Sequence, residues 1–413
     1  MSAQPAGLDA FDGRRAATVD GILRPFSDLT VLEASDVHTA ITLGRLAGGA
    51  DDEVLLAAAL AVRAVRMGHV YVDLATVAAT AAPDDEEVEI DVAALPWPEP
   101  ASWPALVAAS SLTATGDGGP RHAGVRVDGR PLRLLGSRLY LERYWRHERR
   151  VADDLRARGG GGLPPVDEAV LAAGLIRLFG PPPDARTGAD DLQRLAAATA
   201  VRRRLCVVAG GPGTGKTTTV ARILVLLHEQ AAALGAAPPR VALTAPTGKA
   251  AARLAEAVHE EAGRLPTGPA IRRALLATSA STLHRLLGWQ AGNQSRFRHD
   301  AADPLAHNVV VVDESSMVSL SLMARLLDAV RPAARLILVG DPRQLASVEA
   351  GAVLGDIVGL APAGHRVGSE AASPPDPGGP VADGIVVLRR VHRFGAGVAG
   401  VAEAIDAGDP GAT

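Results

Sequence analysis

The chain has 413 residues with a formal net charge of −4, and 47% of its residues are hydrophobic, so it can build two or three domains with sizeable cores. A net charge so close to zero does not exclude binding to nucleic acid, because a protein that follows one strand needs only a local basic groove. The single cysteine, Cys206, excludes a disulfide framework, and no apolar run is long enough to cross a bilayer. The N-terminal residues lack a basic-then-apolar secretion signal. These features predict a cytoplasmic protein without a membrane partner.

The first 155 residues predict a mainly helical N-terminal domain. Apolar residues recur at helical spacing through residues 31–74, and the acidic, proline-rich stretch at 83–100 has the composition of a loop. Residues 131–145 have the pattern of a hairpin that enters a helix, with aromatic residues at Tyr140, Tyr144 and Trp145. Four glycines and two prolines follow within residues 156–165, so we predict a linker at 156–182.

Alternating strands and helices predict an α/β domain at residues 183–362. Apolar runs at 205–209, 241–245, 309–313 and 336–340 are separated by helical patterns. Such runs are typical of a parallel sheet that crossover helices cover on both faces.

The C-terminal residues show a loop followed by a new strand. Residues 363–384 are rich in glycine and proline and predict a surface loop. The apolar run at 385–388 predicts a strand.

Residues 210–217 read GGPGTGKT and fit the phosphate-loop pattern, with Gly210, Gly215, Lys216 and Thr217 at its defined positions. A strand pattern precedes the loop and a helical pattern follows it. In this context main-chain N–H groups and a helix N-terminus bind phosphate oxygens. Lys216 would neutralise the phosphates of ATP, and the Thr217 hydroxyl would hold Mg²⁺. The further residues expected around the nucleotide are Gly211, Gly213, Thr214 and Thr218.

An acidic pair follows the apolar strand at residues 309–313. Asp313 would hold Mg²⁺, and Glu314 would orient the attacking water or accept its proton. Alone, an Asp-Glu pair after a strand is more often a solvated strand end. Its combination with the phosphate loop in one alternating pattern favours the catalytic interpretation.

The run LVGDPRQL at 338–345 ends another predicted strand. The amide of Gln344 could sense the terminal phosphate and report it to a neighbouring groove. The alternative is an ordinary turn, because Gly-Asp-Pro is a good turn sequence.

Two further segments carry groups suited to a nucleic-acid phosphate. At 243–254, LTAPTGKAAARL presents hydroxyl and ammonium groups after a strand, and an ordinary helix cap is the alternative. At 280–288, ASTLHRLLG predicts backbone contacts to DNA, although a lone histidine is more often structural. The candidate residues of the two segments are Thr244, Pro246, Thr247, Lys249, Thr282, His284 and Arg285.

Taken together, these motifs resemble superfamily-one helicases, in the branch that contains the alpha subunit of exodeoxyribonuclease V. The resemblance is carried by GGPGTGKTTTV, TAPTGKAAARL, ASTLHRLLG, VVVDESSM and LVGDPRQLASVEAGAVLGDI, and more weakly by VHRFGAGVAGVAEAIDAGD. HVYVDLA at 69–75 and PLRLLGSRLYLERYWRHERRVA at 131–152 resemble the N-terminal domain of that branch, whereas stand-alone relatives carry a different N-terminal region.

The resemblance implies a 5′-to-3′ DNA helicase that hydrolyses ATP and acts on single strands and duplex ends in DNA repair and recombination. The family's N-terminal domain docks on RecB-like and RecC-like subunits, and the nuclease chemistry belongs to a partner. Gln193 would read adenine, and Arg393 would reach the terminal phosphate from the second lobe. Residues 289–307 lie where the family places a small hairpin that separates the duplex.

The resemblance also implies that residues 183–362 form the first of two RecA-like motor lobes and that residues 385–413 are the start of a truncated second lobe. Residues 1–413 alone would then have weak or no DNA-stimulated ATPase activity. An alternative function is therefore a nucleotide-binding interaction module that docks on partners without moving DNA. A remodelling ATPase is a third interpretation, against which TAPTGKAA and GDPRQL argue.

Overall fold

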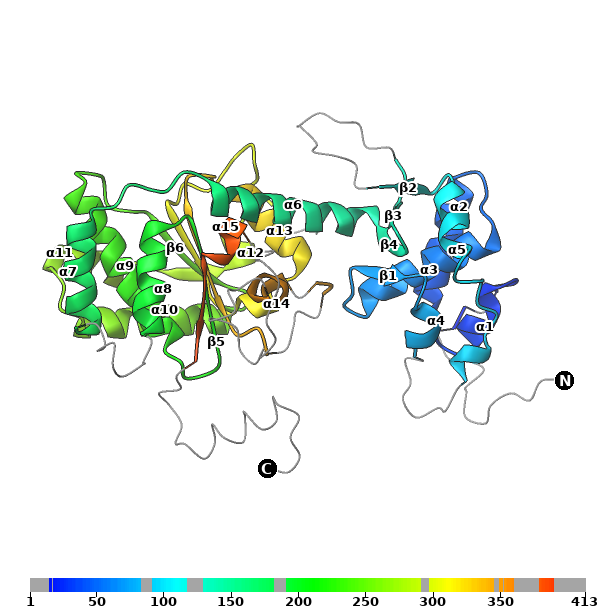
Figure 1. The fold of residues 1–413 in the computed structure, drawn as a ribbon, viewed down its shortest axis with the longest axis horizontal. Helices are drawn as coiled ribbons and strands as arrows, with labels where there is room; N and C mark the ends of the chain where they lie inside the picture. The colour runs from blue at the N-terminus through cyan, green and yellow to red at the C-terminus, as the bar shows by residue number, and fades with distance from the viewer. Residues whose placement is uncertain are drawn as a thin grey trace, which may run out of the picture. The chain divides into compact units, whose positions relative to one another are not determined.

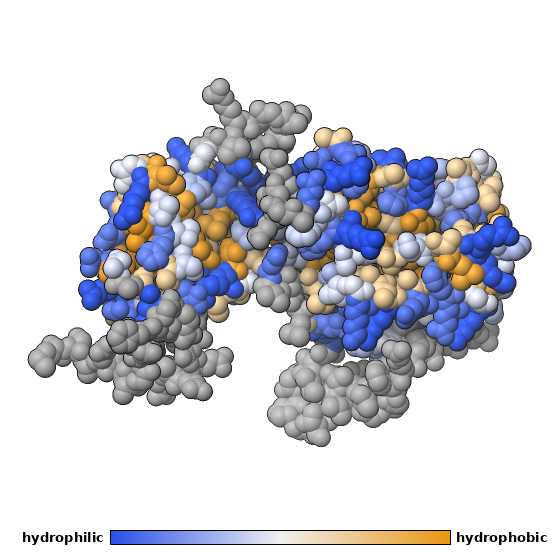
Figure 2. Space-filling view, turned by 180° about the vertical axis from the view of Figure 1, so that it is seen from behind, coloured by the Kyte–Doolittle hydropathy of each residue, from blue (hydrophilic) through white to orange (hydrophobic). Residues whose placement is uncertain are grey.

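A computed structural model describes residues 15–16, 18–82, 91–116, 129–181, 191–290, 297–344, 349–351, 353–359 and 379–389. These residues form two compact units, which divide between Arg149 and Arg150 (Figure 1). Residues 349–351 group with the first unit, where the N–H of Gly351 donates to the carbonyl oxygen of Gly68. Figure 2 shows hydrophilic side chains over much of the visible surface, with apolar residues in scattered patches. Within the described ranges, no helix combines the length and the apolar character that crossing a lipid bilayer requires.

The first unit builds its core around one alanine- and leucine-rich helix. That helix, α3, buries Leu56, Leu60 and the alanines between them, because apolar residues occur on nearly every side of it. Phe26 and Trp103 pack into the same core. The helices of this unit are α1 (Leu23–Asp28), α2 (Ala34–Leu46), α3 (Asp52–Arg66), α4 (Val77–Thr80), α5 (Trp103–Ala109) and the short 3₁₀ helix η1 (Val92–Ala94).

A four-stranded sheet completes the first unit, with strand order β1-β4-β3-β2. The β3–β4 hairpin is antiparallel and feeds directly into helix α6, as the sequence pattern predicts. The strands are β1 (Tyr71–Asp73), β2 (Thr113–Thr115), β3 (Leu132–Leu135) and β4 (Arg138–Leu141), and α6 spans Glu142–Gly160.

The three predicted aromatic residues of this region do not form one cluster. Tyr140 packs against Tyr71, with ring centroids 5.2 Å apart, whereas Tyr144 lies next to His147. Trp145 is buried beneath the Arg133 guanidinium, whose carbon lies 4.3 Å from the ring centroid. Arg133 also makes a buried two-point ion pair with Glu142, through hydrogen bonds of 2.8 and 2.9 Å. This pair joins the hairpin to the start of α6.

The second unit contains a six-stranded parallel sheet with the order β10-β5-β9-β8-β6-β7. The first four predicted strands are confirmed, and their residues are buried almost throughout. The strands are β5 (Leu205–Gly210), β6 (Val241–Ala245), β7 (Ala280–Thr282), β8 (Val309–Val312), β9 (Arg335–Gly340) and β10 (Ile385–Leu388).

Helices cover both faces of this sheet, so the predicted RecA-like class is confirmed. Figure 1 shows α7 to α11 on one side and α13 and α14 on the other. Alternate residues of each strand point to opposite faces, which lets one strand serve both layers. The helices are α7 (Glu168–Phe179), α8 (Leu192–Arg202), α9 (Lys216–Ala233), α10 (Gly248–Arg264), α11 (Pro269–Leu276), α12 (Leu283–Leu286), α13 (Leu320–Ala329), α14 (Val353–Val358), α15 (Gly379–Ala382) and the 3₁₀ helix η2 (Ser315–Met317).

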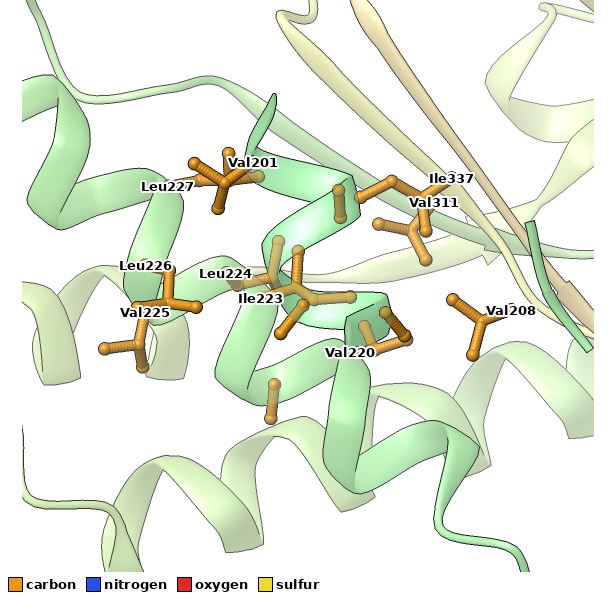
Figure 3. Close-up of a cluster of buried hydrophobic side chains, with 14 of the residues drawn as sticks. Val201, Val208, Val220, Ile223, Leu224, Val225, Leu226, Leu227, Val311 and Ile337 are labelled. Atoms are coloured by element: carbon orange, nitrogen blue, oxygen red, sulfur yellow. The ribbon is translucent and has the colours of Figure 1, made fainter. Parts of the chain in front are cut away.

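Helix α9 is the centre of the larger core. Figure 3 shows Val220 of this helix on the side toward the sheet residues Val208 and Val311, and Val225 and Leu226 on the opposite side. The same helix contacts α7, α8, α10 and α11, so it is covered on several sides. Because the phosphate loop leads into α9, this packing holds the loop on a rigid support.

The predicted linker at residues 156–182 is wrong for most of its described length. Helix α6 continues to Gly160, and α7 occupies Glu168–Phe179. Leu171, Leu175 and Leu178 recur on one face of α7 and bury it against the core of the second unit. Composition alone drew attention to the glycines, whereas the apolar spacing after them determines the structure.

The assignment of residue 385 onward to a second lobe is also wrong for Ile385–Leu388. This strand, β10, pairs in parallel with β5, with Leu388 beside Gly210. It therefore forms the edge of the first sheet, and its four residues are buried there. Arg393 and the rest of that segment lie outside the described residues.

Candidate functional site

Five parallel strands place the candidate residues along one edge of the second unit's sheet. Parallel strands end at the same edge, and that edge is where open α/β sheets bind ligands. The phosphate loop follows β5, Asp341 follows β9, and Asp313 and Glu314 follow β8. The two predicted nucleic-acid segments follow β6 and β7.

Glycines shape the phosphate loop at two positions for different reasons. Gly215 precedes α9 with a φ of 82°, a backbone conformation that other residues rarely adopt. Gly210 is close-packed, since a Cβ atom there would lie 2.9 Å from the carbonyl oxygen of Leu388. Thr214 is buried and its hydroxyl donates to the carbonyl oxygen of Gly211 at 2.9 Å. The first N–H groups of α9 have no acceptor within the helix, so they are available to an anion.

Lys216 lies among main-chain oxygens and carboxylates. Its ammonium donates to the carbonyl oxygens of Gly210 at 2.5 Å and Gly211 at 2.9 Å. Burial lowers its pKa, and the carboxylates of Asp341, Asp313 and Glu314 oppose that shift, with Asp341 exerting the largest influence of the three. The four side chains therefore form one electrostatic group.

Asp341 is a member of this group that sequence reasoning missed. Its side chain is buried, and one carboxylate oxygen accepts from the N–H of Arg343 at 3.0 Å. The sequence signal was present in GDPRQL, where the aspartate was treated only as part of a turn. Its charge acts on Lys216 because β9 lies directly beside β5.

Asp313 and Glu314 occupy the turn after β8. The N–H of Asp313 donates to the carbonyl oxygen of Thr244 at 2.8 Å, and its carboxylate accepts from the N–H of Glu314 at 2.9 Å. Burial raises the pKa of the Asp313 carboxyl to about 6. Glu314 has φ 51° and ψ 39°, a left-handed conformation that costs a non-glycine residue about 1–2 kcal/mol. Such strain is typical of a functional position.

The oxygen atoms at this edge suit a magnesium ion that is also bound by phosphate. Thr217 offers a hydroxyl and Asp313 a carboxylate, the ligand types that Mg²⁺ prefers. Across the described ranges, no group of three or more His, Cys, Asp or Glu side chains is arranged to hold a metal. A site of this kind therefore needs phosphate and water oxygens to complete the coordination.

Gln193 lies against the phosphate loop although it comes from the preceding helix. Its amide donates to the carbonyl oxygen of Thr214 at 2.9 Å. A Cβ atom on Gly215 would lie 2.3 Å from the same nitrogen. The structure thus places the Gln193 side chain directly against the phosphate loop.

Gln344 occupies the turn that the alternative interpretation describes. Its side chain is exposed, and its N–H donates to the carbonyl oxygen of Asp341 at 3.2 Å. The side chain has the exposure that a sensor at this edge needs.

The two predicted nucleic-acid segments lie next to each other, since Ala245 of β6 pairs with Thr282 of β7. Thr247 and Thr282 each cap the helix that follows, through hydroxyls that accept from N–H groups at 3.2 Å. Thr244 is fully buried, and its hydroxyl donates to the carbonyl oxygen of Ser281. The prediction that this hydroxyl is available to a nucleic-acid phosphate is therefore wrong. Pro246 is half-buried. The exposed residues of these segments include Lys249, His284 and Arg285.

Comparisons with known proteins agree with this arrangement. One family, described as an AAA domain, matches residues 193–350, and a second, described as the N-terminal domain of the RecBCD enzyme subunit RecD, matches residues 28–140. A RecBCD enzyme subunit RecD from Mycolicibacterium smegmatis is 47% identical over 394 residues, which are 94% of this chain and 60% of that protein. Over nearly its whole length, the chain is therefore similar to RecD subunits.

Other relatives extend this similarity. The RecBCD enzyme subunit RecD of Mycobacterium tuberculosis strain H37Rv is 48% identical over 95% of this chain and 59% of its own length. An ATP-dependent RecD2 DNA helicase from Deinococcus radiodurans is 35% identical over 54% of this chain and 27% of that protein. The chain therefore spans about three fifths of the length of its two mycobacterial relatives.

Proposed function

We propose that this chain provides the first ATPase lobe of a 5′-to-3′ DNA helicase subunit. The subunit would act in a RecBCD-type helicase–nuclease that processes DNA ends during double-strand break repair. The observation that carries the proposal is that the phosphate loop, Asp341 and the Asp313–Glu314 pair follow three neighbouring parallel strands, β5, β9 and β8, and so lie at one edge of the sheet. A loop of this kind binds a triphosphate, and the acids supply the metal ligand and the base that hydrolysis requires.

Each group of the site has a defined role in the proposed reaction. The loop N–H groups and Lys216 bind the phosphates, while Thr217 and Asp313 hold Mg²⁺. When bound, the metal ion offsets the negative charge of the phosphate oxygens. Glu314 orients the attacking water and accepts its proton. The left-handed backbone of Glu314 supports this role, because strained conformations of this kind are typical of functional positions.

Nucleotide recognition and sensing use residues at the rim of the site. Gln193 binds the adenine, supported by its contact with the loop at Thr214. Gln344 reports the state of the terminal phosphate, and Arg393 contributes a charge from beyond the described residues. An arginine in that role raises the rate of related phosphoryl transfers by roughly 10³–10⁵-fold.

The segments after β6 and β7 bind the DNA backbone. Lys249 and Arg285 supply positive charge, and Pro246, Thr247, Thr282 and His284 line the same edge. Contacts of this type make affinity fall as salt rises, because condensed counterions are released on binding.

The first unit docks the motor on RecB-like and RecC-like subunits. This proposal is supported by the match of residues 28–140 to the RecD N-terminal domain. The chemistry that cuts DNA belongs to a partner in this scheme.

A binding and turnover experiment tests the proposal. Calorimetry of the purified chain should detect binding of ATP in the presence of Mg²⁺, and Lys216→Ala should abolish that binding. Capture on 5′-tailed DNA should be lost in Lys249→Ala, which leaves the nucleotide site intact. A folded chain that ignores nucleoside triphosphates would end the proposal.

Subunit assembly is tested separately. The tagged chain should co-purify with co-expressed RecB-like and RecC-like subunits. Turnover by the assembled complex should be lost in Lys216→Ala at constant subunit yield. If the subunits do not associate while ATP binding persists, the chain is a nucleotide-binding module outside such a complex.

A further inference from the structure

Helix α12 ends in a way that fixes the position of Trp289. The N–H of Gly288 donates to the carbonyl oxygen of Arg285, and the N–H of Trp289 donates to that of His284 at 2.9 Å. With Gly288 at φ 71°, this is a Schellman motif, which reverses the chain at the end of a helix. The motif ends the helix and fixes the backbone of Trp289 one turn beyond His284.

A second strand segment meets the reversed chain and brings another aromatic ring to the same place. The N–H of Arg298 donates to the carbonyl oxygen of Gly288 at 3.1 Å, and Trp289 forms an antiparallel bridge with Phe297. Residues directly opposite in such a pair project to the same side. The rings of Phe297 and His284 are 5.8 Å apart. Trp289, Phe297 and His284, which we call the aromatic platform, therefore converge on one side of the hairpin base.

The aromatic platform faces solvent. Trp289 is 47% exposed, whereas Trp103 and Trp145 are almost fully buried in the first unit. His284 is exposed and Phe297 is half-buried. A tryptophan whose only role is to fill a hydrophobic core would be buried, so core packing does not explain the exposed Trp289.

Positive charge surrounds the aromatic platform. Arg285 is exposed on the adjoining helix, and the Arg298 side chain is 71% exposed. The acid Asp303 lies 3.8 Å from Arg298 and 3.4 Å from the His299 ring, so it offsets part of the Arg298 charge, and Arg285 supplies the main positive charge beside the aromatic platform. Aromatic rings beside cationic side chains are the combination that binds single-stranded nucleic acid, where bases stack and phosphates pair.

We propose that the aromatic platform stacks on an unpaired base of single-stranded nucleic acid, while Arg285 contacts the adjoining phosphate. The inference rests on the proposed DNA-binding function and adds a base contact to it. Trp289 supplies most of the stacking surface, and Phe297 and His284 support its ring. Because every base has a stacking face, the contact is tolerant of sequence.

Fluorescence anisotropy with a labelled oligothymidine and the full chain tests the inference. Trp289→Ala should weaken binding by about 5- to 150-fold, which corresponds to the roughly 1–3 kcal/mol that one stacked base contributes. Trp289→Phe should restore most of the affinity. Leu276→Ala removes a similarly exposed apolar side chain, 48% exposed, and should leave binding unchanged. ATP affinity, measured on each variant, verifies folding.

An abasic strand of equal length distinguishes stacking from charge. Wild type and Trp289→Ala should bind it equally, because the base is missing from both complexes. If Trp289→Ala binds oligothymidine as tightly as wild type, the aromatic platform does not stack on DNA, while the proposed helicase function stands. If wild type fails to bind any single strand, the DNA-binding function fails and the inference fails with it. Loss of partner-subunit capture in Trp289→Ala at unchanged DNA affinity would identify a protein contact instead.

Discussion

The side-chain amide of Gln193 donates a 2.9 Å hydrogen bond to the carbonyl oxygen of Thr214, inside the phosphate loop. The same nitrogen occupies the space in which a Cβ on Gly215 would lie. Helix α8 and the phosphate loop are therefore in direct contact through the Gln193 side chain. Their fit makes the glycine at 215 necessary for two separable reasons, backbone conformation and space.

A double-mutant cycle separates these reasons. Gly215→Ala should destabilise the fold and weaken ATP binding by about tenfold or more, since about 1.4 kcal/mol corresponds to that factor. Adding Gln193→Ala to this variant should remove the clash and recover part of the lost stability. It should leave about 1–2 kcal/mol, which is the cost of an alanine at positive φ. Urea unfolding of the four proteins measures the cycle, and full recovery would contradict the conformational part.

Glu314 combines a catalytic role with backbone strain, and two substitutions separate them. Glu314→Gln should keep ATP binding and lose turnover, because the amide cannot accept a proton. Glu314→Gly should lose turnover as well. Its free energy of unfolding should rise by up to about 1 kcal/mol, because glycine adopts φ 51° without strain. ATPase assays of the assembled complex measure turnover, and urea unfolding of the chain measures stability. Normal turnover in Glu314→Gln would remove this residue from the reaction.

The thiol of Cys206 should be inert in the folded protein. Burial raises its pKa to about 12, so the thiol stays protonated at neutral and mildly alkaline pH. Because the thiolate is the reactive form, labelling by a disulfide reagent at about pH 8 should be more than about a hundredfold slower than in guanidinium. Rapid labelling of the native chain would show that β5 opens readily, against the burial of its residues.

Arg158 should stabilise the second unit through the end of α13. Its guanidinium is 2% exposed and donates to the carbonyl oxygens of Val330, Arg331 and Ala334 at 2.7, 3.2 and 3.3 Å. Arg158→Ala should cost about 2–4 kcal/mol, because buried acceptors lose their partner. Arg156, which pairs with Asp153 at the surface, offers the matched control, and Arg156→Ala should change stability by less than about 1 kcal/mol. Thermal unfolding measures the difference, and equal effects would contradict the assignment.

Much of this molecule was predictable because the patterns are local. Lys216 and Thr217 follow a strand and open a helix, and those two elements can be recognised from neighbouring residues alone. The acids at 313 and 314 follow a run of four valines, which predicts a buried strand and its exposed end. The strand and helix that position such a motif are therefore predictable from the residues next to it in the sequence.

Other features depend on segments that are distant in sequence. The chemistry of Ile385–Leu388 predicts a strand, but only pairing with β5 shows to which sheet the strand belongs. Asp341 influences Lys216 because β9 is inserted beside β5, and Phe297 meets Trp289 because a hairpin returns. Local apolar spacing determines which residues form strands and helices. Strand order and the approach of side chains from different loops are set by the packing of the whole unit, so they emerge only in the tertiary structure.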